Sequence, residues 1–91
     1  MFLTLNLEQL FCSKARAKTI KVLAENKTLN ISAIIKLTKL NHKVVESHLE
    51  FLTEAGIVEE KRYGKVRIFR FKEENIKAKG IKNLIKLIEN F

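Results

Sequence analysis

The feature that most constrains the fold of this chain is a change of residue periodicity at Gly56. Ahead of this glycine, a stripe at helical spacing consists of Val44, Val45, His48, Leu49, Phe51, Leu52 and Ala55. After it, the runs 57–63 and 66–71 are rich in β-branched and aromatic residues, which predicts two strands. Gly64-Lys65 separates these runs and predicts a β-hairpin with a basic turn. Because glycine favours the left-handed backbone that ends a helix, we expect the helix to pass directly into the hairpin.

Polar residues with short side chains predict where the helices begin. Asn6 is the expected cap of a helix that starts at Leu7, and Ser13 that of a helix over about 14–25. Ser32 is expected to cap a helix that ends near Thr38, and Asn41 one over about 41–55. The segment 29–31 is interpreted as a brief strand or an extended entry into the third of these helices. The tail from about Glu73 has helical spacing, with Gly80 as a kink or a break.

Two short helices about three residues apart, followed at once by a hairpin, predict an α+β winged helix-turn-helix. The expected architecture is a three-helix core plus a β-hairpin wing, with an additional C-terminal helix. A chain of 91 residues allows one domain, over 1–91. We assign 10–72 to the winged-helix core and 73–91 to the C-terminal helix.

Composition narrows the possible functions. The net charge of +8 and the pI of about 9.8 favour a polyanionic partner, nucleic acid first. A single cysteine excludes a disulfide scaffold, and no Cys or His spacing matches a zinc site. No apolar stretch approaches 18 residues, and the N-terminus lacks a signal-peptide pattern, so we expect a cytoplasmic protein that contacts no membrane. No phosphate loop or catalytic triad spacing is present, which predicts a protein that is no enzyme. We expect no cofactor or metal, and no small-molecule effector is evident in the sequence.

The predicted recognition helix, about 41–55, has a polar side that suits the major groove. This side carries Asn41, His42, Lys43, Glu46, Ser47 and Glu50. The wing over 61–67 follows it and supplies Lys61, Arg62, Tyr63, Lys65 and Arg67. Cations on a protruding hairpin suit flanking phosphates or a narrow minor groove. Residues 61–72 hold six cations and no acid, so we expect the wing to supply most of the affinity and the helix to discriminate.

Residues 10–72 resemble small archaeal or archaeal-virus winged helix-turn-helix regulators of the arsenic-repressor-like (ArsR) type. The segments that carry the resemblance are 10–16, 40–58 and 63–71, and the Leu-Thr-Glu-Ala-Gly-Ile-Val run at 52–58 is the most specific. The resemblance implies a transcriptional regulator in which Asn41, His42, Lys43, Val44 and Ser47 face double-stranded DNA. Metal-sensing members carry paired cysteines, or histidine and acidic ligands on the C-terminal helix; this chain has neither, so metal sensing is not carried over.

We expect a homodimer, because a small domain gains burial by self-association and operators are commonly two-fold symmetric. The residues expected in the dimer contact are Leu7, Leu10, Phe11, Ile81, Leu84, Ile85 and Ile88. The C-terminal helix is basic and amphipathic, so the competing hypothesis is that it lies on a membrane surface.

Several side chains keep two interpretations. His48 is a half-buried structural residue or a phosphate contact, and His42 is a DNA contact or a solvated side chain. Cys12 is a small core residue or a redox-active thiol. Tyr63 packs on the wing or bonds a phosphate, and the cations of 14–21 form a solvated face or contact phosphates. The competing functions are a winged helix that binds proteins and an architectural protein that binds DNA without sequence preference.

Overall fold

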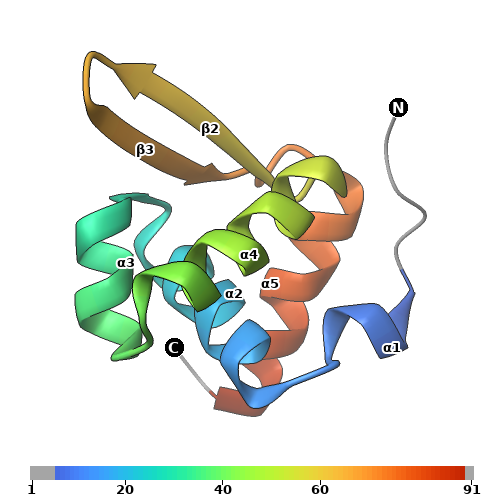
Figure 1. Ribbon diagram of the computed structural model, residues 1–91. Coiled ribbons are helices and arrows are strands. Elements are labelled where there is room, and N and C mark those ends of the chain that lie inside the picture. The colour runs from blue at the N-terminus through green and yellow to red at the C-terminus, as the bar shows by residue number, and fades with distance from the viewer. Residues whose placement is uncertain (1–5, 90–91) are drawn as a thin grey trace.

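The computed structural model describes residues 6–89 (Figure 1). Residues 1–5 and 90–91, which include the ends of the predicted 1–91 domain and 73–91 helix, lie outside the described residues. The element order is α1 (Leu7–Leu10), α2 (Lys14–Asn26), β1 (Thr28–Asn30), α3 (Ile31–Thr38), α4 (His42–Glu54), β2 (Val58–Tyr63), β3 (Val66–Phe71) and α5 (Ile76–Glu89). The β2–β3 hairpin extends away from the helices, and α5 lies on the opposite side of the molecule from α3. The predicted α+β winged helix-turn-helix is confirmed.

Side-chain caps fix the start of each of the first four helices. Asn6, Ser13 and Asn41 are caps, as predicted. The side-chain oxygen of each accepts a hydrogen bond from the backbone N–H three residues later, at 2.8, 3.1 and 2.9 Å, respectively. The prediction for Ser32 is wrong: Asn30 Oδ1 accepts the Ala33 N–H at 2.8 Å, and α3 begins at Ile31. Ser32 therefore lies inside the first turn.

The C-terminal helix starts later than predicted and is continuous. Asn75 Oδ1 accepts the N–H groups of Lys77 and Ala78 at 2.8 and 3.2 Å, so α5 begins at Ile76. The helix continues through Gly80 to Glu89, and the predicted break there does not occur.

The three strands form an antiparallel sheet in the order β1-β3-β2. The hairpin pairs run from Val58↔Phe71 to Tyr63↔Val66, and Gly64 has a φ of 63° in the two-residue turn. Strand β1 pairs with β3 only from Thr28↔Arg70 to Asn30↔Ile68. Residues 62–67 therefore form a two-stranded ribbon beyond the three-stranded part of the sheet.

One hydrophobic cluster joins the helices to the sheet. Its fully buried members include Ile20, Leu23, Ile34, Val45, Leu49, Leu52, Phe69 and Phe71. The predicted core stripe of α4 is thus confirmed, and Gly56 has the expected positive φ, 81°. The prediction that Cys12 is a core residue is wrong, because it lies exposed between α1 and α2 while its neighbour Leu10 is buried.

Candidate nucleic-acid interface

The first half of α4 exposes polar side chains at the surface. Asn41, His42, Lys43 and Ser47 are exposed and Val44 is half-buried. Lys43, Val44, Ser47 and His48 line a shallow hollow of about 380 Å³. Since Asn41 caps the helix with its side-chain oxygen, its amide donors remain available, and the positive end of the helix dipole lies beside them.

His48 has a structural environment. It is half-buried, and its Nδ1 accepts a hydrogen bond from Arg16 Nε at 3.2 Å. The Arg16 guanidinium carbon also lies 3.9 Å from the centroid of the Phe51 ring. Burial first, and then the positive charge of Arg16, lowers the pKa of His48, which favours the neutral acceptor. Of the two interpretations of His48, this geometry favours the structural one, and Arg16 packs on α4 instead of forming a solvated face.

The outer wing exposes four of its five predicted contact residues: Lys61, Arg62, Tyr63 and Lys65. Lys61 Nζ lies 3.9 Å from Glu59, and Arg62 Nε donates to Glu60 at 3.1 Å, but both cationic side chains are more than half exposed. Exposed ion pairs of this kind contribute little to stability and exchange partners readily. These two cations therefore stay accessible to an anionic ligand.

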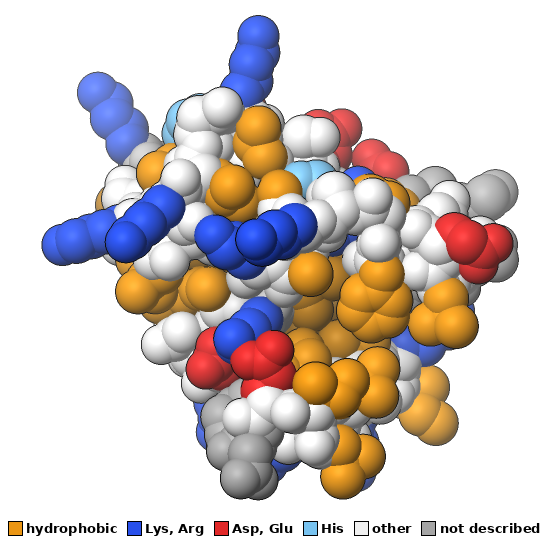
Figure 2. All heavy atoms as spheres, turned by 90° about the horizontal axis from the view of Figure 1, so that it is seen from below, with side chains coloured by type: hydrophobic (Ala, Val, Ile, Leu, Met, Phe, Trp, Pro, Cys, Tyr) orange, Lys and Arg blue, Asp and Glu red, His pale blue; other side chains and the backbone are white. Residues whose placement is uncertain are grey.

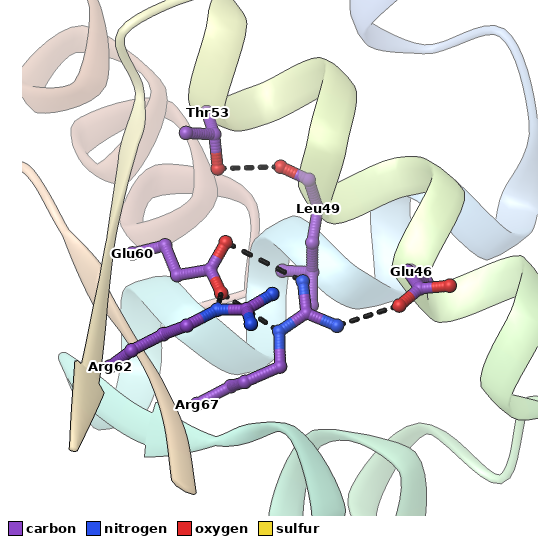
Figure 3. Close-up of polar contacts among 6 residues, drawn as sticks. All are labelled: Glu46, Leu49, Thr53, Glu60, Arg62 and Arg67. Carbon is purple, nitrogen blue, oxygen red and sulfur yellow. Dashed lines mark hydrogen bonds and ion pairs between the residues drawn. The ribbon is translucent and has the colours of Figure 1, made fainter. Parts of the chain in front are cut away.

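Arg67, the fifth predicted wing residue, differs from these four (Figure 3). Its side chain is only 21 % exposed, and its Nη1 donates to Glu46 on α4 at 2.6 Å. Its Nε donates to Glu60 on β2 at 2.8 Å. The hydrogen bond from Arg67 lowers the pKa of the Glu60 carboxyl, so both partners remain charged near neutral pH. The structure thus places Arg67 between the wing and α4 rather than among the accessible wing cations.

Carboxylates outside residues 61–72 neutralise part of the charge of the wing, and no sequence pattern predicted them. Arg70 donates to Glu59 at 3.0 Å and to Glu74 at 2.8 Å, and this contact lowers the pKa of Glu74 to about 2. Residues 61–72 contain no acid, but the neighbouring segments supply these partners. The charge of the wing is therefore partly neutralised, and the expectation that the wing supplies most of the affinity stays a prediction. The strand register could have revealed the contact between Glu60 and Arg67. Arg67 lies opposite Arg62, and Glu60 lies two residues from Arg62 on the same strand, so the three side chains share one face of the sheet.

The predicted dimer residues gather on one face, formed by α1, α2 and α5. Leu7, Phe11, Leu84 and Ile88 are 67, 47, 39 and 71 % exposed, Ile85 is half-buried, and Leu10 and Ile81 are buried beneath them. Two adjoining hollows of about 340 and 330 Å³ lie on this face, and Phe11 and Leu84 line both. Figure 2 shows hydrophobic side chains clustered on this underside of the molecule.

Two further observations concern residues 6–89 alone. None of their helices combines the length and apolar character needed to cross a membrane. Nor do their His, Cys and Glu side chains form any group of three or more suited to a metal ion.

The family described as "Bacterial regulatory protein, arsR family" matches residues 13–60. No curated protein sequence matches the chain. Among solved structures, the transcriptional repressor PagR of Bacillus anthracis shares 26 % identity, covers 85 % of each chain and has a TM-score of 0.68.

Two more distant structures share the fold. HlyU from Vibrio cholerae is 16 % identical, with a TM-score of 0.75 over 90 % of this chain and 86 % of its own. A homodimeric winged helix-turn-helix DNA-binding domain from Mycobacterium bovis is 21 % identical, with a TM-score of 0.71 over 90 % of this chain and 73 % of its own. These relatives come from bacteria, and the archaeal source stays a prediction.

Proposed function

The chain belongs to the arsR family of bacterial regulatory proteins, and we propose that it is a homodimeric regulator of transcription that binds double-stranded DNA sequence-specifically. The observation that carries the proposal is the exposed polar face of α4, next to a hairpin that extends away from the helices and is exposed over residues 61–66. A helix of this kind fits the major groove, while a two-stranded ribbon contacts the flanking backbone or minor groove.

We assign base and phosphate contacts in the major groove to the exposed start of α4. The Asn41 amide donors and the Ser47 hydroxyl suit base edges, and the Lys43 ammonium suits a phosphate or guanine. His42 is exposed beside them, and Val44 offers an apolar contact to a thymine methyl group.

The outer wing would contact the sugar–phosphate backbone. Lys65 lies at the turn and has no carboxylate within ion-pair distance among residues 6–89, so its charge is available. Lys61 and Arg62, whose side chains are 55 and 65 % exposed, can exchange their carboxylate partners for phosphates. Tyr63 is 62 % exposed, and its hydroxyl would reach a phosphate as a further donor.

The apolar face of α1, α2 and α5 would form the dimer contact. Apolar side chains with this exposure, next to a hollow with room for a partner side chain, favour a protein interface. An isologous contact would place two α4 helices on half-sites one helical turn apart. The M. bovis domain with this fold is described as homodimeric, which supports this assignment.

The test is selection of bound duplexes from a random pool, followed by a salt titration on the enriched sequence. We expect a palindrome. If the dimer neutralises about eight phosphates, the log–log salt dependence has a slope of about −7. Lys65→Ala should weaken binding to all sequences alike, Ser47→Ala should change sequence preference, and Lys79→Ala on α5 serves as the control. A slope near zero would refute DNA binding.

A second function is favoured by one observation. Glu46, Glu50, Glu54 and Glu60 line a hollow of about 340 Å³ between α4 and the wing. Carboxylates there would repel DNA phosphates and would suit a protein partner. Absence of any enriched duplex, together with a flat salt dependence, would support this alternative, whereas tight binding without an enriched sequence would support an architectural role.

A further inference from the structure

The connection between the wing and α4 depends on few contacts. Beyond the Asn30↔Ile68 pair, the hairpin has no third strand, and residues 62–67 form a two-stranded ribbon. Such ribbons are at most marginally stable on their own. The direction of the ribbon relative to α4 therefore requires contacts at its base.

Arg67 makes this contact, one residue outside the three-stranded part of the sheet. Its guanidinium donates to Glu46 on α4 at 2.6 Å and to Glu60 on β2 at 2.8 Å (Figure 3). Arg62 lies directly opposite Arg67 in the hairpin and also donates to Glu60, at 3.1 Å. Two arginines at a directly opposed pair repel each other, so the shared carboxylate stabilises this base of the ribbon.

We infer that Arg67 is a positioning residue, which fixes the wing to the recognition helix through Glu46 and thereby sets the selectivity of DNA binding. The inference rests on the function proposed above. Arg67 itself contacts no DNA. Glu46 is held toward the wing and reads no base, although it lies on the polar side of α4.

The chemistry of the site favours arginine in this role. A guanidinium has donors in a planar fork and can bond carboxylates in two directions at once, whereas a lysine ammonium acts as a point charge. Among residues 6–89, Arg67 is also the only cation lining the hollow that contains Glu46, Glu50, Glu54 and Glu60. It bonds two of these four carboxylates, and without it Glu46 would lose its partner and Glu60 would be held by Arg62 alone, beside the DNA-facing surface.

The competing hypothesis is that Arg67 leaves its carboxylates and bonds a phosphate when DNA binds. The two hypotheses differ in their response to a lysine. A phosphate contact depends mainly on charge, so Arg67→Lys would largely preserve it. A bond to two carboxylates on different elements depends on the fork, so Arg67→Lys would lose it.

The experiment compares Arg67→Lys, Arg67→Gln, Glu46→Gln and the double variant E46Q/R67Q with the wild-type chain. The matched control is Arg70→Lys, which changes an arginine on the same strand that bonds two other carboxylates, Glu59 and Glu74, neither of which lies on α4. Dissociation constants are measured across a salt series for the enriched duplex and for an unrelated duplex of equal length. Thermal unfolding establishes that each variant is folded at the assay temperature.

We expect both single Arg67 variants and Glu46→Gln to reduce the ratio of specific to unspecific affinity about tenfold, a change typical of residues coupled in one ion-pair network. The salt slope should stay unchanged, and the double variant should be no worse than Arg67→Gln. A loss of stability alone would not change this ratio in a folded variant.

Three results would overturn the inference. The first two are that Arg67→Lys or Glu46→Gln keeps the wild-type ratio of specific to unspecific affinity. The third is that the salt slope of Arg67→Gln is shallower than that of the wild-type chain by about 0.9, the change expected for one lost phosphate contact. Glu46→Gln keeps the test decisive if the Arg67 variants do not fold.

Amide hydrogen exchange of the free proteins separates this inference from the proposed function. We expect the amides of residues 62–67 to exchange faster in Glu46→Gln than in the wild-type chain, while exchange in α4 stays unchanged. This result is expected even if the wild-type chain binds no duplex. Unchanged exchange there would refute the fixed wing, whatever the DNA-binding result.

Discussion

Arg16 joins the start of α2 to α4, and its replacement by methionine should destabilise the fold measurably. Methionine keeps an unbranched apolar stem on Phe51 but removes the charge and the donors. The lost contacts are the hydrogen bond to His48 Nδ1 at 3.2 Å, the bond from Nη1 to the Gln9 carbonyl at 2.5 Å, and the guanidinium over the Phe51 ring at 3.9 Å.

The expected magnitude follows from these three contacts. Each hydrogen bond contributes about 1 kcal/mol net, and a partly exposed cation–π contact contributes about 1 kcal/mol. Arg16 lies in the first turn of α2, where a cation opposes the helix dipole, so its removal returns about 0.3–1 kcal/mol. The net loss in the free energy of unfolding is therefore about 2 kcal/mol, a large share of the total for a small domain.

The assay is urea unfolding at one fixed protein concentration, because a dimer makes apparent stability depend on concentration. Lys36→Met is the control, since Lys36 is an exposed cation on α3 that does not line the hollows of the proposed dimer face, and it should change stability by less than about 0.5 kcal/mol. If Arg16→Met and Lys36→Met unfold at the same urea concentration with the same slope, Arg16 does not couple the two helices as described.

Three further predictions concern stability. The pKa of His48 is lowered in the folded chain, so the unfolded chain takes up the proton first as the pH falls. The free energy of unfolding should therefore decrease as the pH drops below about 6.5. His48→Gln should flatten this dependence when urea unfolding is measured between pH 5 and 8. Lys39→Gly should raise stability by up to about 1 kcal/mol, because Lys39 ends α3 at a φ of 60° that glycine adopts without strain; a lower urea midpoint would contradict this. Leu49→Ala should cost about 2–5 kcal/mol by leaving a cavity under α4, and a loss below about 1 kcal/mol would mean that the core repacks around it.

Local sequence signals predicted the elements well because their causes are local. The caps at Asn6, Ser13 and Asn41 act on N–H groups three residues away, and the strands follow from β-branched residues around one turn. The prediction for Ser32 failed because the start of α3 depends on where β1 ends, and the strand ends at Asn30, which therefore caps the helix two residues earlier.

Contacts between distant segments could not be predicted from the same signals. Glu46 and Arg67 lie 21 residues apart, and their bond depends on how α4 crosses the base of the hairpin. The half-burial of His48 follows from its apolar neighbours at helical spacing, but its partner Arg16 is 32 residues away. Cys12 was misassigned because its apolar neighbours indicate burial, whereas the chain turns between two helices at that point and directs the thiol outward.

The pairing of β1 with β3 ends at the Asn30↔Ile68 pair, and this has an evolutionary consequence. Because the turn lies beyond this point, a residue inserted on each side of Gly64-Lys65 would add one cross-strand pair and extend the hairpin by about 3.4 Å. The side chains nearer the base would keep their faces, since only an unmatched insertion shifts the register. A lineage could therefore change how far this hairpin reaches beyond the helices while α4 stays as it is.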